Sequence, residues 1–514
     1  MFYFIPAWYP EGRTWYDDTY IWYRRPIGSR FDDSINQLRM FHTVGEACQL
    51  LVLNYRPNLR YYCHRYDLLE VDTWSVFDDI QGIGQIPVRI LDYMDLDWPV
   101  GAEFINSPFL VMVRLQGQPY AQIEFGEEGQ MVWVDLFEEG LISKKLVFDD
   151  RGFLSSILYY EGGAEHHQDY LGLDGIWRIR EYLLPDDNHV EVNPLFQDAM
   201  WQSSYGRIED LIQERLTVYF SHTERQEGVI VLASDPRHNH LVRSVKKNRK
   251  LVLSFFGERH PIQEGTNFQE ELADCRLVVT DTFKKAEALQ EVSKIPVQHQ
   301  SLFDTRLALG KSQRLKELIL YVLIDGLSWS QLKGVLDCLF ESMAENQHIY
   351  LSLVSYSPDF SFQQEMEKKL TELLEHRPES YLFLQDQTET RMFEFGDESE
   401  KTSRIALHFL HSEMEIITHL DSARLIIDLA DEPNLYTQIA GISAGIPQVN
   451  RVETEFVEHM KNGYILDVPE RIGEAIDFYL TGLTNWNKSL IYSVQKIADY
   501  TKGVLVEKMK EKIE

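Results

Sequence analysis

The sequence predicts an α/β protein with two Rossmann-like domains and an antiparallel β-sheet inserted into the first. Three observations carry this prediction. Short buried-type apolar runs alternate with helix-length segments at both ends of the chain, and hydrophobic residues alternate with polar ones between about residues 87 and 205. The length of 514 residues allows two to four domains, and 44% hydrophobic with 25% charged residues is a globular composition.

The first α/β domain is expected to comprise residues 1–86 and 206–310. An apolar strand at 2–5, a helix at 34–42 and a buried-type strand at 49–53 begin an α/β unit with a parallel sheet. Ile35, Leu38 and Phe41 recur at helical spacing in this helix. A helix at 208–220 then precedes further strands at 228–232, 250–254 and 276–280.

The insert is expected to comprise residues 87–205. Ile123, Phe125, Val132 and Val134 alternate with polar neighbours on either side of a Gly-Glu-Glu-Gly turn at 126–129, which is typical of an antiparallel meander. Residues 101–200 hold 18 acidic against 6 basic side chains. We therefore expect an acidic partner-binding surface, and expect that deleting residues 101–200 leaves a folded α/β body.

The second α/β domain is expected to comprise residues 311–483, followed by a C-terminal helix at 484–514. Strands are predicted at 318–324, 348–354, 381–384, 405–409, 424–428 and 448–450. The tail is predicted as one long amphipathic helix, with an apolar stripe made of Trp486, Leu490, Ile491, Val494 and Ile497.

Charge and cysteine content narrow the class of partner and the compartment. The 50 Lys and Arg against 81 Asp and Glu give a net charge of −31, which disfavours nucleic-acid binding over a broad face. Four cysteines without a Cys-x-x-Cys pair indicate reduced thiols rather than a disulfide framework. The N-terminus lacks a signal-peptide pattern, and no apolar run approaches the ~20 residues of a membrane helix. We expect a cytoplasmic protein whose membrane contact, if any, is peripheral.

One basic run stands out against this acidic background. It has two interpretations: the solvated face of a helix, which is the commoner outcome, or a docking patch for an acidic partner or an anionic lipid surface. Its members are Arg237, Arg243, Lys246, Lys247, Arg249 and Lys250.

Other candidate sites are weaker. His166 and His167 have metal-ligand side chains, but adjacent histidines on a strand point to opposite faces, so a solvated turn after Gly162 and Gly163 is favoured over a metal site. His238 is placed on a surface loop. The sequence has no Walker-A lysine loop and no Gly-x-Ser-x-Gly elbow, so no metal and no cofactor is expected, and any ATP use belongs to a partner.

The segment 431–468 resembles the donor half of GT-B glycosyltransferases. It has an acidic residue, a helix ending in small residues, Gly-x-Pro at 445–447, a strand, and Asn-Gly at 462–463. In retaining members of that fold, two glutamates eight positions apart contact the donor sugar and the nucleotide ribose. The resemblance places the first on Glu432 and the second on Ala440, which cannot accept a hydrogen bond from a ribose hydroxyl.

A second element of that fold is an arginine and a lysine that bind the donor diphosphate just after the first strand of this half. Here the strand at 318–324 is followed by Asp325, and the arginine position falls on Gly326. A carboxylate beside a diphosphate weakens binding. The resemblance therefore implies a degenerate donor site made of Glu432, Ala440, Asp325 and Gly326, with no catalytic residue.

The whole chain resembles the family formed by the first of the three accessory secretory proteins of Gram-positive bacteria. The resemblance rests on the opening MFYFIPAWY, the stretch GLDGIWRIREYL at the end of the insert and the tail motif GISAGIPQVN. It implies a GT-B-like fold with an extended β-sheet insert. It also implies assembly with the two other accessory secretory proteins and the accessory Sec motor ATPase, in the export of serine-rich repeat glycoprotein adhesins.

Two functions follow from these observations. The first is a non-catalytic adaptor, in which a transferase fold has lost its donor site and presents surfaces to partners. The alternative is an active retaining GT-B glycosyltransferase that modifies the adhesin with the help of Glu432. The fold alone does not distinguish them, because function resides in the site.

Overall fold

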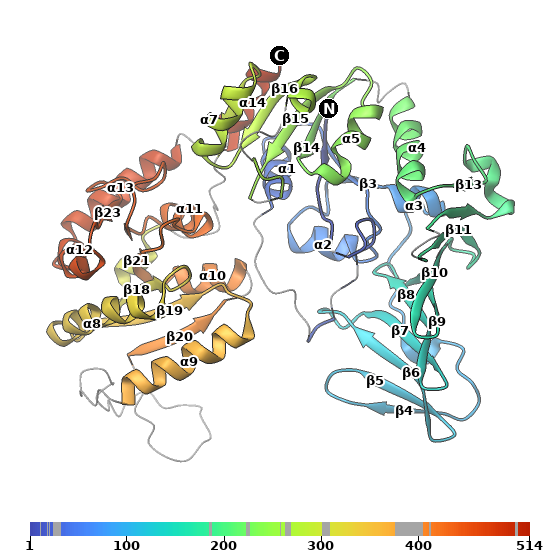
Figure 1. Ribbon diagram of the computed structural model, residues 1–514, viewed down its shortest axis with the longest axis horizontal. Helices are drawn as coiled ribbons and strands as arrows, with labels where there is room; N and C mark the ends of the chain where they lie inside the picture. Colours follow the sequence, from blue (N-terminus) through green and yellow to red (C-terminus); the bar gives the residue numbers. More distant parts are fainter. Residues whose placement is uncertain are drawn as a thin grey trace. The chain divides into compact units, whose positions relative to one another are not determined.

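The computed structural model describes residues 1–10, 12–17, 19, 21–23, 32–184, 188–222, 227–257, 259–262, 269–300, 309–375, 404–410, 413–498 and 502–514. The chain divides into two compact units (Figure 1). Unit 1 takes in the described residues up to His299 together with Val506–Glu514, and unit 2 takes in the described residues of Gln300–Leu505.

A parallel sheet with the order β17-β16-β15-β14-β1-β2-β3 forms the centre of unit 1. Its middle strands are mostly apolar because helices cover both faces of a parallel sheet, and β14 is apolar and buried at every position. The predicted strands at 2–5, 49–53, 228–232, 250–254 and 276–280 are confirmed to within one or two residues. The strands are β1 (Phe2–Ile5), β2 (Cys48–Val52), β3 (Asp72–Ser75), β14 (Val229–Ala233), β15 (Lys250–Phe255), β16 (Cys275–Thr280) and β17 (Val297–His299).

Several helices of unit 1 begin at residues whose side chains cap them. Asp32 accepts a hydrogen bond from the Ile35 backbone at the start of α1, and Thr282 does the same for Lys285 at α7. The caps fix where α1 and α7 begin, whereas α4 begins without a side-chain cap. The predicted helices at 34–42 and 208–220 are confirmed. The helices are α1 (Asp33–Thr43), α2 (Leu59–Arg65), α3 (Val76–Gln81), α4 (Ile208–Ser221), α5 (Pro236–Val245), α6 (Gln269–Leu272) and α7 (Phe283–Val292).

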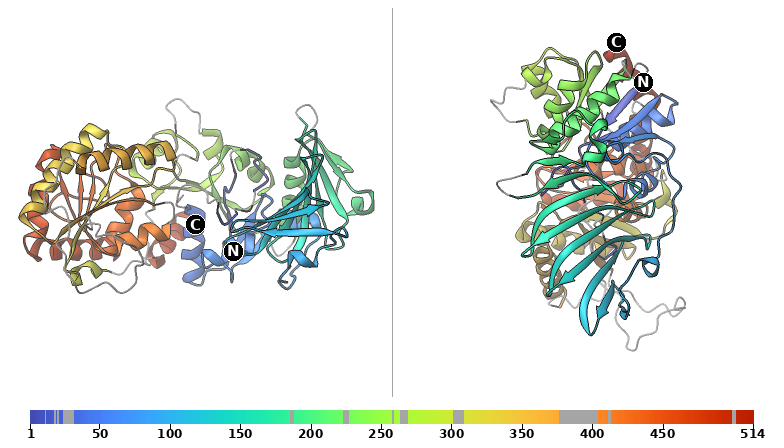
Figure 2. Two further views of the ribbon diagram at one scale, coloured as in Figure 1. Left: turned by 90° about the horizontal axis from the view of Figure 1, so that it is seen from below. Right: turned by 90° about the vertical axis from the view of Figure 1, so that its right-hand side faces the viewer.

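The insert forms an antiparallel sheet in which β4 to β13 follow one another in chain order. Figure 2 shows these strands side by side as one twisted sheet. The predicted meander is therefore confirmed. Its strands are β4 (Ala102–Asn106), β5 (Val111–Leu115), β6 (Gln118–Phe125), β7 (Met131–Glu138), β8 (Leu141–Asp149), β9 (Phe153–Glu161), β10 (Ala164–Leu171), β11 (Trp177–Tyr182), β12 (Val190–Val192) and β13 (Ser204–Tyr205).

The insert shares its core with the rest of unit 1. Val147, Tyr170 and Ile179 belong to the same buried cluster as the strands of the parallel sheet. The buried Gln81 amide of α3 donates hydrogen bonds to the carbonyl oxygens of Ser155 (2.8 Å) and Leu171 (2.6 Å). Deleting residues 101–200 would expose this core to water and remove both acceptors of the Gln81 amide, which argues against the expectation that the α/β body folds without them.

An ion pair connects the turn between β8 and β9 of the insert to α3. The Arg151 guanidinium lies 2.7 Å from the Asp78 carboxylate and 2.6 Å from that of Asp149. Next to it, Asp150 accepts a hydrogen bond from the backbone N–H of Tyr61 (2.7 Å). Burial is the larger cause and the negative charge of Asp149 the smaller one, and together they raise the pKa of Asp150 to about 7.

This raised pKa predicts how stability depends on pH. As the pH rises from about 4 to 7, the unfolded chain releases the Asp150 proton while the folded protein retains it, so this group favours folding less and less. Asp150→Asn keeps an acceptor for Tyr61 without the charge. The unfolding free energy of the variant relative to the wild type should therefore rise between pH 4 and 7 and level off above 7, as measured by urea titration.

Asp174→Asn is the matched control for this series. The hydrogen bond from Arg178 lowers the pKa of Asp174. The contribution of Asp174 to the unfolding free energy is therefore lost only as the pH falls below the usual pKa range of aspartate. A flat difference for Asp150→Asn between pH 4 and 8 would contradict a protonated Asp150.

Unit 2 is a second parallel sheet, with the order β20-β19-β18-β21-β22-β23. The predicted strands at 318–324, 348–354, 405–409, 424–428 and 448–450 are confirmed, and the one at 381–384 lies outside the described residues. The strands are β18 (Leu318–Leu323), β19 (Ile349–Ser355), β20 (Ile405–Phe409), β21 (Ala423–Asp428), β22 (Gln448–Asn450) and β23 (Gly463–Ile465).

Seven described helices follow from residue 329 onward. The capping box between Ser328 and Gln331 fixes the start of α8, and the left-handed Gly445 (φ 71°) ends α11. They are α8 (Trp329–Glu345), α9 (Phe360–Glu375), α10 (Glu413–Leu420), α11 (Leu435–Ala444), α12 (Ile472–Leu480), α13 (Thr484–Ala498) and α14 (Lys502–Ile513). Among the described helices, none has both the length and the apolar character needed to cross a bilayer.

The predicted apolar stripe of the tail is partly wrong. Where one long helix is expected, the structure has α13 and α14. The buried face of α13 is Trp486, Ser489 and Ser493, whereas Ile491 and Val494 are 59% and 44% exposed. Helix α13 packs closely against α11, where small side chains fit best, so hydrophobicity alone misplaces its buried face.

Candidate functional site

The carboxyl ends of the strands in unit 2 are the first place to look for a ligand site. Parallel α/β sheets bind ligands where the strand order reverses, beyond the carboxyl ends of the strands. In unit 2 this switch point lies between β18 and β21. The loop after β18 carries Asp325 and Gly326, and β21 ends at Asp428, so the predicted clamp positions do lie at the switch point.

The Asp325 carboxylate is hydrogen-bonded within the protein, to one side chain and one backbone group. Its carboxylate accepts hydrogen bonds from the Ser355 hydroxyl (2.5 Å) and the backbone N–H of Tyr356 (2.7 Å), both at the end of β19. Burial raises its pKa. Asp325 therefore joins the loops after β18 and β19 and places an acidic group where a cationic clamp would be needed.

Gly326 marks a close approach of two loops. Its backbone is left-handed (φ 78°), and a Cβ atom added there would lie 3.0 Å from the Cβ atom of Ala430, which follows β21. An arginine at this position would be strained by its backbone and crowded by Ala430. The departure from the family pattern is thus built into the backbone.

Asp428 adds a second acidic group to the switch point. Its carboxylate accepts hydrogen bonds from the backbone N–H groups of Ala430 (3.2 Å) and Asn434 (2.7 Å). Burial raises the pKa of Asp428 to about 6, and the charge of Asp325 contributes to the rise. Two neighbouring carboxyl groups repel an anion such as a diphosphate.

Tyrosine side chains lie just beneath these carboxylates. The Tyr321 and Tyr356 hydroxyls are 2.6 Å apart, and the Tyr356 hydroxyl is 2.8 Å from Thr437 Oγ1 on α11. Tyr321 is fully buried. The sequence analysis missed this network because tyrosines at 321 and 356 follow no motif, and their proximity depends on the pairing of β18 with β19.

The two residues at the predicted glutamate positions have unlike surroundings. Glu432 is exposed and lies before Asn434, whose side chain caps α11 by accepting from the Thr437 backbone. Ala440 is fully buried and belongs to the cluster of Tyr321, Leu323 and Ile426. The carboxylate that the family pattern would place at 440 would thus enter the core.

The switch point of unit 1, between β1 and β14, is also occupied by side chains of the chain itself. His238 is fully buried, with Nδ1 2.7 Å from the Tyr9 hydroxyl and Nε2 2.6 Å from the Ala233 carbonyl oxygen. Burial lowers the pKa of His238 to about 4. The placement of His238 on a surface loop is wrong, because α5 begins at Pro236 and turns this histidine inward.

Arg249 does not belong to the predicted basic patch, because its side chain is buried. It is 1% exposed, and its guanidinium donates hydrogen bonds to the carbonyl oxygens of Phe220 (2.9 Å) and Lys246 (3.3 Å). It also lies over the Phe220 ring at 4.1 Å. Arg249 holds the end of α4 against β15, so it cannot take part in a docking surface.

The other members of the basic run lie nearer the surface, and acidic or hydroxyl groups engage most of them. Arg237 pairs with Asp235 (2.7 Å), Arg243 and Lys246 share Asp274 (3.0 and 3.5 Å), Lys247 donates to the Ser221 hydroxyl (2.8 Å), and Lys250 is half-buried on β15. These five residues remain a predicted docking patch of reduced net charge.

The two adjacent histidines lie on a strand. His166 and His167 are in β10, where a shift in register between Glu165 and His167 brings their Nδ1 atoms within 2.7 Å. The prediction of a turn at these positions is wrong, since the turn ends at Gly163. Across the described part of the chain, no group of three potential ligands could hold a metal ion.

Solved structures with low sequence identity show the fold. The pneumococcal O-GlcNAc transferase GtfA, solved in complex with UDP and GlcNAc, is 12% identical to this chain. It has a TM-score of 0.67, with 100% of this chain and 98% of that chain covered. The fold is therefore that of GT-B glycosyltransferases, as the sequence analysis predicts.

Relatives with higher identity show the family. The family model of accessory Sec system protein 1 matches residues 1–514. A curated member from Streptococcus gordonii is 40% identical over 504 residues, which are 97% of this chain and 96% of that protein.

Two solved complexes contain similar chains. The Glycosylation Associate Protein (Gap123) complex of Streptococcus agalactiae matches with 43% identity, a TM-score of 0.89 and all of both chains covered. The structure of accessory secretory proteins 1, 2 and 3 of Streptococcus pneumoniae matches with 34% identity and a TM-score of 0.86, covering 100% of this chain and 99% of that one. The chain described here therefore belongs to the family of accessory Sec system protein 1.

Proposed function

We propose that this protein is a non-catalytic component of accessory Sec export, which assembles with accessory secretory proteins 2 and 3. The observation that carries the proposal is the switch point of unit 2, where acidic side chains are hydrogen-bonded to the neighbouring loops. Asp325 and Asp428 place acidic groups where a donor diphosphate would lie, and a clamping side chain at Gly326 would be strained by the left-handed backbone and crowded by Ala430. The solved complexes of similar chains support the choice of partners.

The wider assembly is proposed on the family resemblance. The protein acts in the cytoplasm with the accessory Sec motor ATPase, on serine-rich repeat glycoprotein adhesins, and touches the membrane at most peripherally. The acidic insert supplies a partner-binding surface, because its 18 acidic side chains within residues 101–200 favour a basic partner.

Calorimetric titration with uridine-diphosphate sugars tests the absence of a donor site. Loss of two charge-assisted contacts, each worth about 1.5–3 kcal/mol, weakens binding by several orders of magnitude. We expect no heat of binding at millimolar nucleotide sugar, whereas the GtfA transferase gives a saturable signal under the same conditions. A micromolar Kd or hydrolysis of the donor would favour the active glycosyltransferase.

The exposed Glu432 provides the second arm of this test. In a retaining transferase, Glu432→Gln would remove a contact to the donor sugar and slow the reaction about a hundredfold or more. In the adaptor, this variant should export the adhesin and co-purify with accessory secretory proteins 2 and 3 as the wild type does. Loss of export by a folded, partner-bound Glu432→Gln protein would contradict the adaptor function.

A further inference from the structure

One side of strand β3 in unit 1 carries no neighbouring strand in the described chain. Strand β3 is the last strand of the parallel sheet and pairs with β2 only, in the register Gln49↔Asp72 to Val52↔Ser75. On an edge strand, every second residue directs its N–H and C=O groups away from the sheet. These groups can form a ladder with a further strand.

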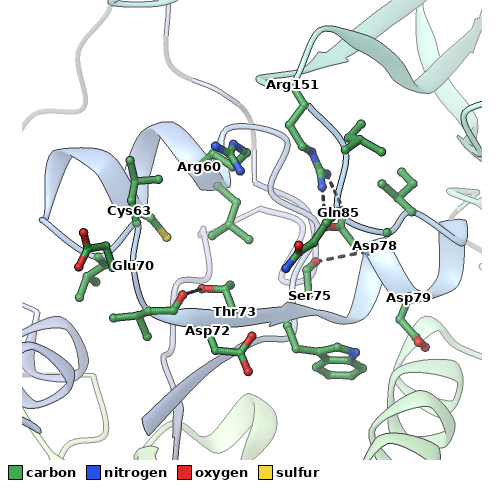
Figure 3. A pocket seen from close by; sticks show the side chains of 18 residues that line it. Arg60, Cys63, Glu70, Asp72, Thr73, Ser75, Asp78, Asp79, Gln85 and Arg151 are labelled. Atoms are coloured by element: carbon green, nitrogen blue, oxygen red, sulfur yellow. Dashed lines mark hydrogen bonds and ion pairs between the residues drawn. The ribbon is translucent and has the colours of Figure 1, made fainter. Parts of the chain in front are cut away.

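A cavity of about 740 Å³ runs along this strand (Figure 3). Every residue from 68 to 75 lines it, including all four residues of β3. Successive side chains of a strand point to opposite faces of the sheet, so a cavity that touches all of them lies beside the backbone edge. This geometry distinguishes it from a pocket on one face of the sheet.

The walls of the cavity beside β3 come from four segments, one of which is α3 with Asp78 and Asp79. Helix α2 contributes Leu59, Arg60 and Cys63, the segment after α3 contributes residues 83–86, and the insert contributes Arg151. Leu69 is 48% exposed at the rim. The cavity therefore offers apolar surface next to the strand edge, as sites that take an extended peptide do.

The charges at the cavity favour a basic side chain on the occupant. Asp78 and Asp79 are held by Arg151 and Arg215, at 2.7 and 2.6 Å. Glu70 and Asp72, at the start of β3, are exposed, and the Asp72 carboxylate accepts a hydrogen bond from the Gln49 amide of β2 (2.6 Å). Arg60, on α2, is the one exposed arginine among the residues that line the cavity. A lysine or arginine near Glu70 and Asp72 would complement this side of the cavity.

We propose that the edge of β3 takes an extended, lysine- or arginine-bearing segment of a partner protein as an added strand. Backbone hydrogen bonds to β3 supply most of the affinity, and Glu70 with Asp72 selects the basic residue. The four residues of β3 span roughly 13 Å, enough for a short strand of similar length. The site is distinct from the switch points and holds whether or not the protein has transferase activity.

Fluorescence anisotropy with a dye-labelled eight-residue peptide tests the proposal on the full chain. The probe alternates lysine and valine. Two control peptides carry N-methyl groups on every second backbone nitrogen, one on the odd-numbered residues and the other on the even-numbered residues, so that each blocks one edge of the peptide strand. We expect saturable binding of the parent peptide and a loss of about tenfold or more for one of the two methylated phases. Equal binding of all three peptides, or binding of none, would overturn strand addition.

Two charge-reversal variants test where the peptide binds. Glu70→Lys should weaken binding of the parent peptide at least about fivefold, because it reverses a charge at the cavity. Glu103→Lys makes the same change at an exposed position on the edge strand β4 of the other sheet and should leave binding unchanged. Hydrogen exchange of residues 69–76 should slow only with the parent peptide, and an equal effect of both variants would contradict the assignment to β3.

Discussion

Replacing Ala440 by glutamate should destabilise the protein by about 3 kcal/mol or more, and should not create a donor site. Ala440 is fully buried among Tyr321, Leu323 and Ile426, so the new carboxylate would enter an apolar cluster without a counter-charge. The free energy of unfolding from urea titration measures the cost. Calorimetry with a uridine-diphosphate sugar measures whether nucleotide binding appears.

Ala440→Ser is the matched control for this substitution. A serine hydroxyl in a helix can donate to the carbonyl oxygen four residues earlier, so this variant should lose only about 1 kcal/mol. A stable Ala440→Glu protein that binds the nucleotide sugar would show that position 440 still faces a ligand cleft. That result would contradict the occupied switch point as the basis of the proposed function.

Reversing the charge of Arg249 should destabilise the folded protein by about 3–5 kcal/mol. The guanidinium is 1% exposed and donates to the carbonyl oxygens of Phe220 and Lys246. Arg249→Glu would remove the side-chain donor of the Phe220 carbonyl oxygen and bring a buried carboxylate beside both oxygens, although the backbone N–H of residue 249 would still donate to Lys246. Circular dichroism melting and urea titration measure the effect.

Lys247→Glu is the control, because Lys247 lies next to Arg249 in the predicted patch but at the surface. It should change the unfolding free energy by no more than about 0.5 kcal/mol. Loss of adhesin export in Lys247→Glu with a normal fold would support a docking patch at the surface members of the run. A fully stable Arg249→Glu protein would contradict the buried role of this arginine.

The secondary structure follows from local patterns in most of the chain. Strands such as 2–5 and 318–323 are apolar because both faces of a parallel sheet are covered, and the antiparallel insert alternates because its two faces differ. Strand β3 was not predicted, because its sequence Asp-Thr-Trp-Ser has no apolar run. An edge strand is paired on one side only and tolerates polar residues, so its pattern is weak.

The sequence by itself determined the α/β class, the antiparallel insert and the family, since these depend on periodicity and on the order of motifs along the chain. Only the tertiary structure decided which polar residues are buried. Arg249 and His238 resemble surface residues in the sequence, yet both are enclosed by partners distant in sequence, such as Phe220 and Tyr9. Asp325 and Asp428 likewise meet only because β18 pairs with β21, a contact across about a hundred residues that no local pattern encodes.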